Sequence, residues 1–327
     1  MEESAAVSIS ELEHSVPQAV LDRLSTLLTT QEYEATLRSF ANPKQLTFRV
    51  NTILASQEEV IEELHQCHIE TKAIPWCPLG YQVTKGSIRE LQDTESYTAG
   101  KLYIQSASSM LSVLALQVQP KMRVLDMCAA PGSKTSQIAT LMQNEGMLIA
   151  NDRSRKRLYR LREILQQQAA TNVEIIQGLG ENLGLTHADC FDRVLVDVPC
   201  SGEGRFRLDR PVRLNRWNEQ EINSLSKLQQ QLLSTALRCV VTGGLVVYST
   251  CTFAPEENEL VLEKVLKKSS IDASLVPLPS EFLPPSARGP VSSWKNHEFS
   301  NRVEHALRII PDETCTGFFV ACIKRHS

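Results

Sequence analysis

The 327-residue sequence lacks the features that mark several specialised classes of protein. It has no run of about 18 apolar residues, the length that a membrane-spanning helix needs. Its first ten residues, MEESAAVSIS, are acidic and contain no apolar segment, so we expect no signal peptide. It has no basic excess, with 34 Lys and Arg against 38 Asp and Glu. Any surface that binds nucleic acid must therefore be a local patch.

Paired cysteines are also missing. The nine cysteines are scattered and form no CxxC pair, so a chain of this length is not expected to rely on disulfides. Free thiols suit a reducing compartment, and we expect a cytoplasmic protein. Cys128, Cys200 and Cys251 are conceivable zinc ligands, but local CxxC or His spacing is absent, so no metal is expected.

The first third of the chain has the pattern of a small mixed module. Residues 17–40 carry spaced apolar residues that predict helices. From Leu46 to about Thr84 the pattern is strand, helix, strand, which fits a compact α+β unit. Pro75 and Pro78 predict a turn within it. We place this module at residues 1–111.

After Pro120 the pattern changes to short apolar strands that alternate with amphipathic helices. This alternation predicts an α/β fold with a doubly wound, mostly parallel sheet over residues 112–327. Two C-terminal segments, ALRII and GFFVACIKR, predict an antiparallel pair at the end of the chain. A Rossmann-like sheet that ends in an antiparallel strand is the methyltransferase version of this fold.

The turn after the first of these strands, DMCAAPGSKT, is predicted to bind a cofactor. Small residues let the backbone approach a ligand, and the following helix offers free N–H groups to an anion such as a methionine carboxylate. Asp152 ends the next strand about 20 residues past Gly132, where an acidic side chain can hold two ribose hydroxyls. These features alone do not separate adenosylmethionine from NAD, although the GxGxxG of a dinucleotide site is absent. A tight turn without a ligand is the third possibility.

Two cysteines follow neighbouring predicted strands. Asp197 and Cys200 close one strand and Cys251 closes the next, so we expect the three side chains to converge at one sheet edge. Carbon 5 of cytosine is a poor nucleophile until a group such as a thiolate adds to carbon 6. A nearby carboxyl can stabilise charge at N3, and a second thiol can assist release. A free cysteine is more often a buried filler, but two beside Asp197 favour catalysis.

Four ordered motifs, DMCAAPGSKT, ND at 151–152, DVPCSGEG and STCTFAPEEN, resemble the Sun-type (Fmu-type) family of RNA cytosine-C5 methyltransferases. The resemblance covers most of the chain from about residue 45. It implies that Cys251 is the nucleophile, Cys200 aids release, Asp197 contacts the pyrimidine, and Lys134 lies near the methionine end of the cofactor and the target nucleotide. The cofactor, S-adenosyl-L-methionine, would be held by Cys128, Ala129, Ala130, Pro131, Gly132, Ser133, Lys134, Asp152 and Asp197.

One departure from the family concerns its third motif. The family usually has an acidic residue where this chain has Gly178-Leu179-Gly180. If Leu179 occupies that position, backbone or apolar contacts must replace a side-chain hydrogen bond to adenine.

RNA contacts are predicted in the loop EGRFRLDRPVRLNRW, where arginines suit phosphates and exposed rings can stack on bases. The arginines selected there are Arg205, Arg207 and Arg213; a solvated loop with buried aromatics is the alternative. The basic run at 153–162 is at least as well explained by a solvated helix face. For Arg49 and Asn51, the resemblance alone implies RNA contact.

The sequence therefore predicts transfer of a methyl group from S-adenosylmethionine to a cytosine in ribosomal or transfer RNA through a covalent adduct between Cys251 and carbon 6. The expected partner is the RNA substrate, with no membrane and no obligate protein partner. A nicotinamide-dependent oxidoreductase would leave Cys200 and Cys251 idle. A non-catalytic RNA-binding assembly factor on the same fold would have no need of both cysteines and Asp197.

Overall fold

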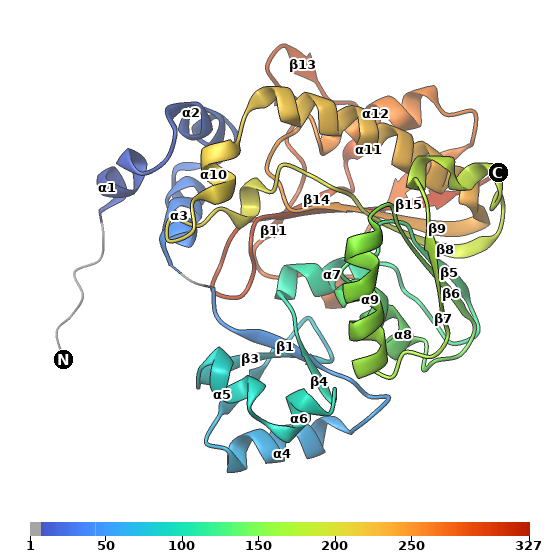
Figure 1. Ribbon diagram of the computed structural model, residues 1–327. Coiled ribbons are helices and arrows are strands. Elements are labelled where there is room, and N and C mark those ends of the chain that lie inside the picture. Colours follow the sequence, from blue (N-terminus) through green and yellow to red (C-terminus); the bar gives the residue numbers. More distant parts are fainter. Residues whose placement is uncertain (1–7, 43) are drawn as a thin grey trace.

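The computed structural model describes residues 8–42 and 44–327. The first seven residues, which belong to the segment where no signal peptide is predicted, lie outside the described residues. Two sheets form the framework: a nine-stranded sheet in the C-terminal part and a four-stranded sheet in the N-terminal part, seen at the bottom of Figure 1. None of the helices in the described ranges combines the length and apolar composition needed to cross a membrane.

The large sheet has the predicted doubly wound core. Its parallel strands are β5 (Arg123–Asp126), β6 (Met147–Asp152), β7 (Val173–Gln177), β8 (Phe191–Asp197) and β9 (Val240–Thr250). The main strand order is β11-β14-β15-β9-β8-β5-β6-β7. The remaining strands are β10 (Ala273–Val276), β11 (Ala287–Arg288), β14 (Leu307–Ile309) and β15 (Phe318–Arg325). β15 runs antiparallel between β9 and β14, so the predicted antiparallel C-terminal strand is confirmed.

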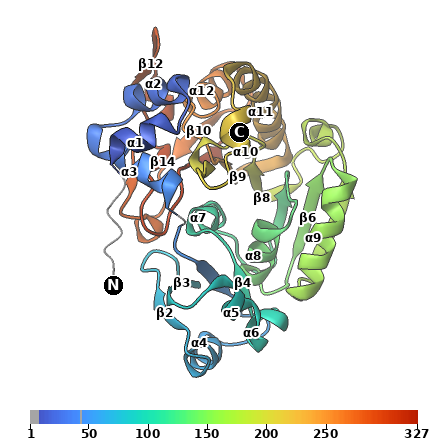
Figure 2. The ribbon, with the colours of Figure 1, turned by 60° about the vertical axis from the view of Figure 1, so that its left-hand side comes forward.

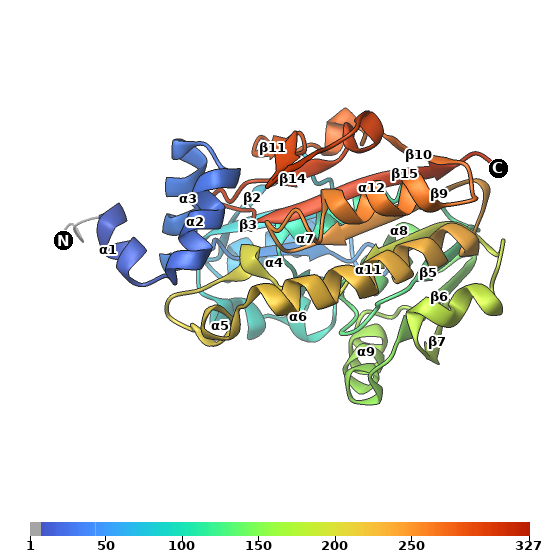
Figure 3. The same ribbon diagram turned by 90° about the horizontal axis from the view of Figure 1, so that it is seen from above.

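Helices cover both faces of this sheet (Figure 3). On one face lie α7 (Ala107–Ala115), α8 (Ser133–Leu141) and α9 (Arg155–Gln167); on the other lie α11 (Glu219–Cys239) and α12 (Glu259–Lys268). Successive strand residues point to opposite faces, so in β9 Val246 and Tyr248 join the core under α11 and α12, whereas Leu245 and Val247 join the other. Because both faces of the sheet are covered by buried apolar side chains, the ends of its strands are where a ligand can bind.

The small sheet has the order β2-β3-β1-β4 and is antiparallel throughout. Its strands are β1 (Thr47–Val50), β2 (Glu70–Ala73), β3 (Gly80–Lys85) and β4 (Leu102–Ile104), and its helices are α4 (Gln57–Gln66), α5 (Ile88–Gln92) and α6 (Glu95–Thr98). Phe48 and Val50 pack there against Val60 and Leu64 from one face of α4. The predicted α+β module is present, with β4 as an additional strand.

The N-terminal helices pack on the C-terminal part of the chain (Figure 2). They are α1 (Ile9–His14), α2 (Gln18–Leu27) and α3 (Thr30–Ala41). Their apolar faces share a core with Phe206, Phe253 and Trp294, and Arg23 of α2 bonds to Glu256 at 2.7 Å. They therefore cover the loops that follow β8 and β9. The remaining elements are η1 (Gly180–Leu185), η2 (Glu203–Arg205), α10 (Val212–Arg216), η3 (Ser280–Phe282), β12 (Ser293–Trp294), β13 (His297–Glu298) and η4 (Asn301–Val303).

Candidate functional site

A pocket of about 840 Å³ lies at the carboxyl ends of β5, β6, β8 and β9. This is the edge where parallel sheets present their loops to ligands. Residues 103–106, at the end of β4 and directly after it, and Ser109 of α7 form part of its wall. Of the predicted site residues, those that line it are Cys128, Ala129, Ala130, Pro131, Ser133, Lys134, Asp152, Asp197, Cys200, Arg205, Arg213 and Cys251.

Gly132 supports the pocket from behind. It is the N-cap of α8 with a φ of 119°, a conformation that favours glycine. A Cβ at this position would lie 2.8 Å from Cδ1 of Leu161, so a larger residue would require the Leu161 side chain to move. Glycine here lets the turn run close to α9 while Ser133 and Lys134 face the pocket.

Acidic side chains line the floor of the pocket. Asp152 is buried, and its carboxylate accepts hydrogen bonds from the backbone N–H groups of Ser154 at 2.9 Å and Ala130 at 3.3 Å. Asp126 is also buried; Thr135 donates to its Oδ2 at 2.8 Å, and burial raises the pKa of its carboxyl to about 7. Asp126 was not predicted as a site residue, although it begins the predicted turn.

Two buried oxygen atoms on this floor have no hydrogen-bond partner among the described residues. They are Oδ1 of Asp126 and Oδ1 of Asn151, and both residues line the pocket. A buried polar atom without a partner is costly, so such atoms point to a ligand or water as the missing donor. The floor is therefore suited to a ligand that carries hydroxyl or amino groups.

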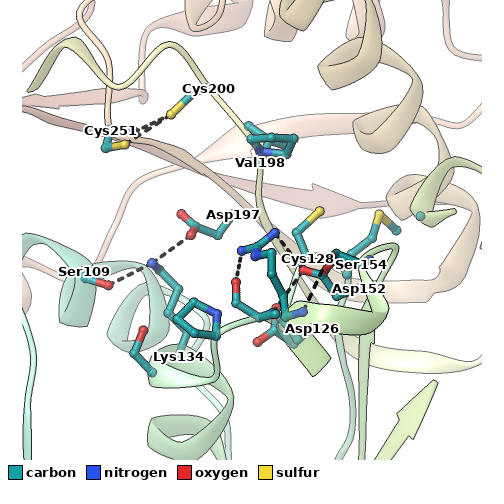
Figure 4. Close-up of a pocket in the computed structure, with 18 of the residues that line it drawn as sticks. Ser109, Asp126, Cys128, Lys134, Asp152, Ser154, Asp197, Val198, Cys200 and Cys251 are labelled. Atoms are coloured by element: carbon teal, nitrogen blue, oxygen red, sulfur yellow. Dashed lines mark hydrogen bonds and ion pairs between the residues drawn. The ribbon is translucent and has the colours of Figure 1, made fainter. Parts of the chain in front are cut away.

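Lys134 and Asp197 form the centre of the site (Figure 4). The Lys134 ammonium donates to Asp197 Oδ2 and to Ser109 Oγ, each at 2.8 Å. Ser249 donates to the other oxygen of Asp197 at 2.8 Å, because β8 and β9 pair Asp197 directly with Ser249. Both oxygens of Asp197 therefore accept a hydrogen bond, one from Lys134 and one from Ser249. The Lys134 ammonium has three N–H donors and uses two of them within the described part of the chain, so one remains for a ligand.

Cys200 and Cys251 face each other with their sulfur atoms 3.2 Å apart (Figure 4). The hydrogen bond from the Cys200 thiol lowers the pKa of Cys251 to about 7, and the Arg205 and Arg213 guanidiniums act in the same direction. The same contact and burial raise the pKa of Cys200. The contact therefore favours the thiolate form of Cys251 and the thiol form of Cys200.

The basic loop after Cys200 is divided between pocket and surface. Arg205 and Arg213 line the pocket. Arg207 does not; it forms an exposed ion pair with Asp209 at 2.5 Å. Phe206 is buried against Phe40 with ring centroids 5.5 Å apart, so its ring is not available to stack on a base.

Arg49 and Asn51 do not lie where the prediction of RNA contact needs them. Both are buried, at 1% and 0% exposure, between β1 and the large domain. Arg49 donates to Gln105 and Ser136, and Asn51 donates to the backbone carbonyls of Gly100 and Gln168. These protein partners, rather than phosphates, explain the two polar residues.

The third motif is also clarified. Leu179 is 48% exposed and does not line the pocket, whereas the next two residues, Gly180 and Glu181, do. The acidic side chain at this edge of the pocket therefore comes from Glu181, two positions after the one that the motif pattern indicates.

Comparisons with known proteins agree with this geometry. Residues 113–324 match the model of the family described as 16S rRNA methyltransferase RsmB/F, and residues 16–107 match that of the N-terminal domain of 16S rRNA methyltransferase RsmF. Ribosomal RNA small subunit methyltransferase F of Aeromonas salmonicida is 35% identical over 91% of this chain. The chain spans 61% of the length of that relative.

Solved structures give the same result. A methyltransferase homolog protein from Pyrococcus horikoshii superposes with a TM-score of 0.82 and 31% identity, covering 98% of this chain and all of that one. NSun6 from the same organism, crystallised with SFG, has a TM-score of 0.79 and 20% identity over 95% of this chain and 98% of that one. At that identity the second likeness concerns the fold.

Proposed function

Since this chain belongs to the RsmB/F family of 16S rRNA methyltransferases, as the resemblance to Sun-type enzymes predicts, we propose that it methylates carbon 5 of a cytosine in small-subunit ribosomal RNA. The observation that carries the proposal is the thiol pair of Cys200 and Cys251, 3.2 Å apart at the pocket that Lys134 and Asp197 line. Neither a nicotinamide-dependent oxidoreductase nor a non-catalytic RNA-binding factor needs that pair.

The pocket fits S-adenosylmethionine, the methyl donor of this family. Its volume is in the range of small-molecule sites, and the unpartnered oxygens of Asp126 and Asn151 suit a ligand with hydroxyl and amino donors. Asp152 and the turn from Cys128 to Lys134 would hold it. When bound, S-adenosylmethionine supplies an electrophilic methyl group.

Cys251 is the proposed nucleophile. Its thiolate adds to carbon 6 of the cytosine, forming a carbon–sulfur bond and leaving an electron pair available at carbon 5. The lowered pKa of Cys251 provides the thiolate near neutral pH. Lys134, held by Asp197 and Ser109, is placed to balance negative charge that develops on the ring.

Release requires the reverse change. After the electron pair at carbon 5 has taken the methyl group and S-adenosylhomocysteine is left, the carbon 5 proton passes to water. The electron pair of that C–H bond re-forms the carbon 5–carbon 6 double bond, and the Cys251 thiolate departs from carbon 6. Cys200 is the proposed aid to this step because its sulfur lies next to that of Cys251.

Arg205 and Arg213, at the wall of the pocket, are proposed to bind RNA phosphates. We also propose residues 1–111 as the RNA-positioning module and 112–327 as the catalytic domain.

The two cysteines can be tested separately with a transcript of small-subunit ribosomal RNA. Cys251→Ala should abolish methylation, whereas Cys200→Ala should permit attack and accumulate a covalent protein–RNA adduct, seen as a slow band on a denaturing gel. The double variant should form no adduct. Binding of S-adenosylhomocysteine, measured as a rise in melting temperature, should survive in all three. Full methylation by Cys251→Ala would refute the proposal, and an adduct in that variant would reverse the two roles.

A further inference from the structure

Two buried glutamates connect the loops that carry the active-site thiols. The first loop (residues 198–206) contains Cys200 and Glu203, and the second loop (residues 251–258) contains Cys251 and Glu257. Both glutamates are buried, at 4% and 0% exposure, and neither lines the pocket. Buried carboxylates are costly unless they accept hydrogen bonds, so their partners indicate what they do.

Glu203 holds the second loop. Its Oε2 accepts hydrogen bonds from the Thr252 hydroxyl at 2.9 Å and from the Phe253 backbone N–H at 3.0 Å. Its Oε1 accepts from the Trp217 indole N–H at 2.9 Å. Thr252 directly follows Cys251 in the chain, so this carboxylate fixes the backbone next to the nucleophile.

Glu257 holds the first loop in the same manner. Its Oε2 accepts from the Ser201 backbone N–H at 3.0 Å and from Gln229 at 2.8 Å, and the Ser201 hydroxyl bonds to its Oε1. Ser201 directly follows Cys200. Each loop thus provides the glutamate that anchors the residue after the cysteine of the other loop. The Ser201 and Thr252 hydroxyls, 2.7 Å apart, join the two anchored positions.

We propose that Glu203 and Glu257 are positioning residues that hold Cys200 against Cys251 by anchoring each other's loops. The inference rests on the proposed function for its meaning, because the thiol pair is the proposed catalytic pair. Its physical consequence does not depend on RNA: if either anchor is lost, the two sulfur atoms separate and Cys251 loses the hydrogen bond from Cys200.

The direction of the change in the pKa of Cys251 distinguishes a positioning role from a direct electrostatic effect of the glutamates. The charged or titratable groups that act on Cys251 include Cys200, Asp197, Arg205 and Arg213, and Glu257, whose own pKa burial raises to about 7, acts on Cys200. Removal of a carboxylate from this neighbourhood would by itself favour the thiolate and lower the pKa of Cys251. Loss of the Cys200 hydrogen bond has the opposite effect and raises it. The two explanations therefore predict shifts in opposite directions.

The test is the pH dependence of alkylation of Cys251 by iodoacetamide in the full chain without RNA, followed by mass spectrometry of its peptide. Glu203→Ala and Glu257→Ala should each move the midpoint from about 7 toward an ordinary thiol value. A midpoint near ~8.5 would slow alkylation at pH 7 about 15-fold through the smaller thiolate fraction. Glu257→Gln should restore part of the wild-type profile, since its oxygen can still accept from the Ser201 N–H.

Glu256→Ala is the matched control. Glu256 is a buried carboxylate of the second loop, but it bonds to Arg23 and Trp294 rather than to the first loop. It should lower the melting temperature without moving the alkylation midpoint. An unchanged or lowered midpoint in both Glu203 and Glu257 variants, or an equal rise in Glu256→Ala, would overturn the proposal. If an alanine variant does not fold, Glu257→Gln takes its place and should raise the midpoint by only part of the alanine shift, because its amide nitrogen cannot accept a hydrogen bond as the second carboxylate oxygen does.

The outcome is separable from that of the proposed function. A wild-type protein that methylates RNA while the midpoints stay unchanged would remove the positioning role and leave the methyltransferase. Raised midpoints in a protein that methylates no RNA would keep the positioning role and remove the cytosine reaction.

Discussion

Replacement of Arg49 by methionine tests whether this residue joins the two parts of the protein or binds RNA. Its guanidinium is fully buried and has no carboxylate partner among residues 8–42 and 44–327, and burial lowers its pKa to about 10. It donates to Gln105 at 3.0 Å, to Ser136 at 2.7 Å and to Thr140 at 3.4 Å, and it lies 5.2 Å from the ring centroid of Tyr103. Tyr103 belongs to β4 of the small sheet and Gln105 directly follows it, whereas Ser136 and Thr140 belong to α8.

The expected loss follows from what each partner retains. Ser136 and Thr140 still donate to backbone carbonyls of Gly132 and Ser136, so their hydroxyls stay satisfied. The Oε1 of Gln105 loses its donor inside the protein, which costs about 1–3 kcal/mol, and the contact with Tyr103 contributes about 1 kcal/mol more. Methionine removes the desolvated charge but also the hydrogen bonds to α8. We therefore expect the free energy of unfolding to fall by about 2–4 kcal/mol.

The assay combines urea unfolding with RNA binding at several salt concentrations. Arg49→Met should lower the unfolding midpoint and leave the salt dependence of RNA affinity as in wild type. Arg49→Lys should have an intermediate unfolding midpoint. A lysine ammonium lacks the planar, forked guanidinium that lets Arg49 reach all three acceptors. Unchanged stability together with a salt slope reduced by about one would mean that Arg49 binds a phosphate, and would refute the structural role.

Two further predictions concern the pocket. Arg205→Ala with Arg213→Ala should weaken RNA binding and lower its salt slope by about two, whereas Arg207→Ala, which breaks only the exposed pair with Asp209, should change neither; equal losses would contradict a role specific to the pocket. Because burial raises the pKa of Asp126 from 3.8 to about 7, this carboxyl favours the folded state below pH 4 and loses that contribution as pH rises through 7. The melting temperature of Asp126→Asn relative to that of wild type should therefore rise steadily between pH 4 and 7. A difference in melting temperature that is constant across this range would contradict the raised pKa of Asp126.

Much of the large domain could be predicted because its signals are local. Short apolar strands, the Gly132 turn and the polar residues at strand ends each lie within a few positions of one another, and the parallel sheet brings the ends to one edge. The helix α7 and the pocket wall at residues 103–106 carry no comparable signal. Residues 273–298 were difficult for a different reason: their strands are two to four residues long, too short for an alternating pattern.

The contact between the small sheet and α8 shows why the roles of Arg49 and Asn51 could not be derived from sequence. The resemblance to Sun-type enzymes implies RNA contact for Arg49, yet its hydrogen-bond partners are Gln105 and Ser136, far along the chain. Arg49 bonds to Ser136, whose hydroxyl donates to the Gly132 carbonyl at the start of α8, the helix that also carries Lys134. The small sheet is thus connected by buried hydrogen bonds to the cofactor turn. A change among these hydrogen bonds that weakens RNA methylation would therefore act through the position of α8, even though Arg49 does not line the pocket.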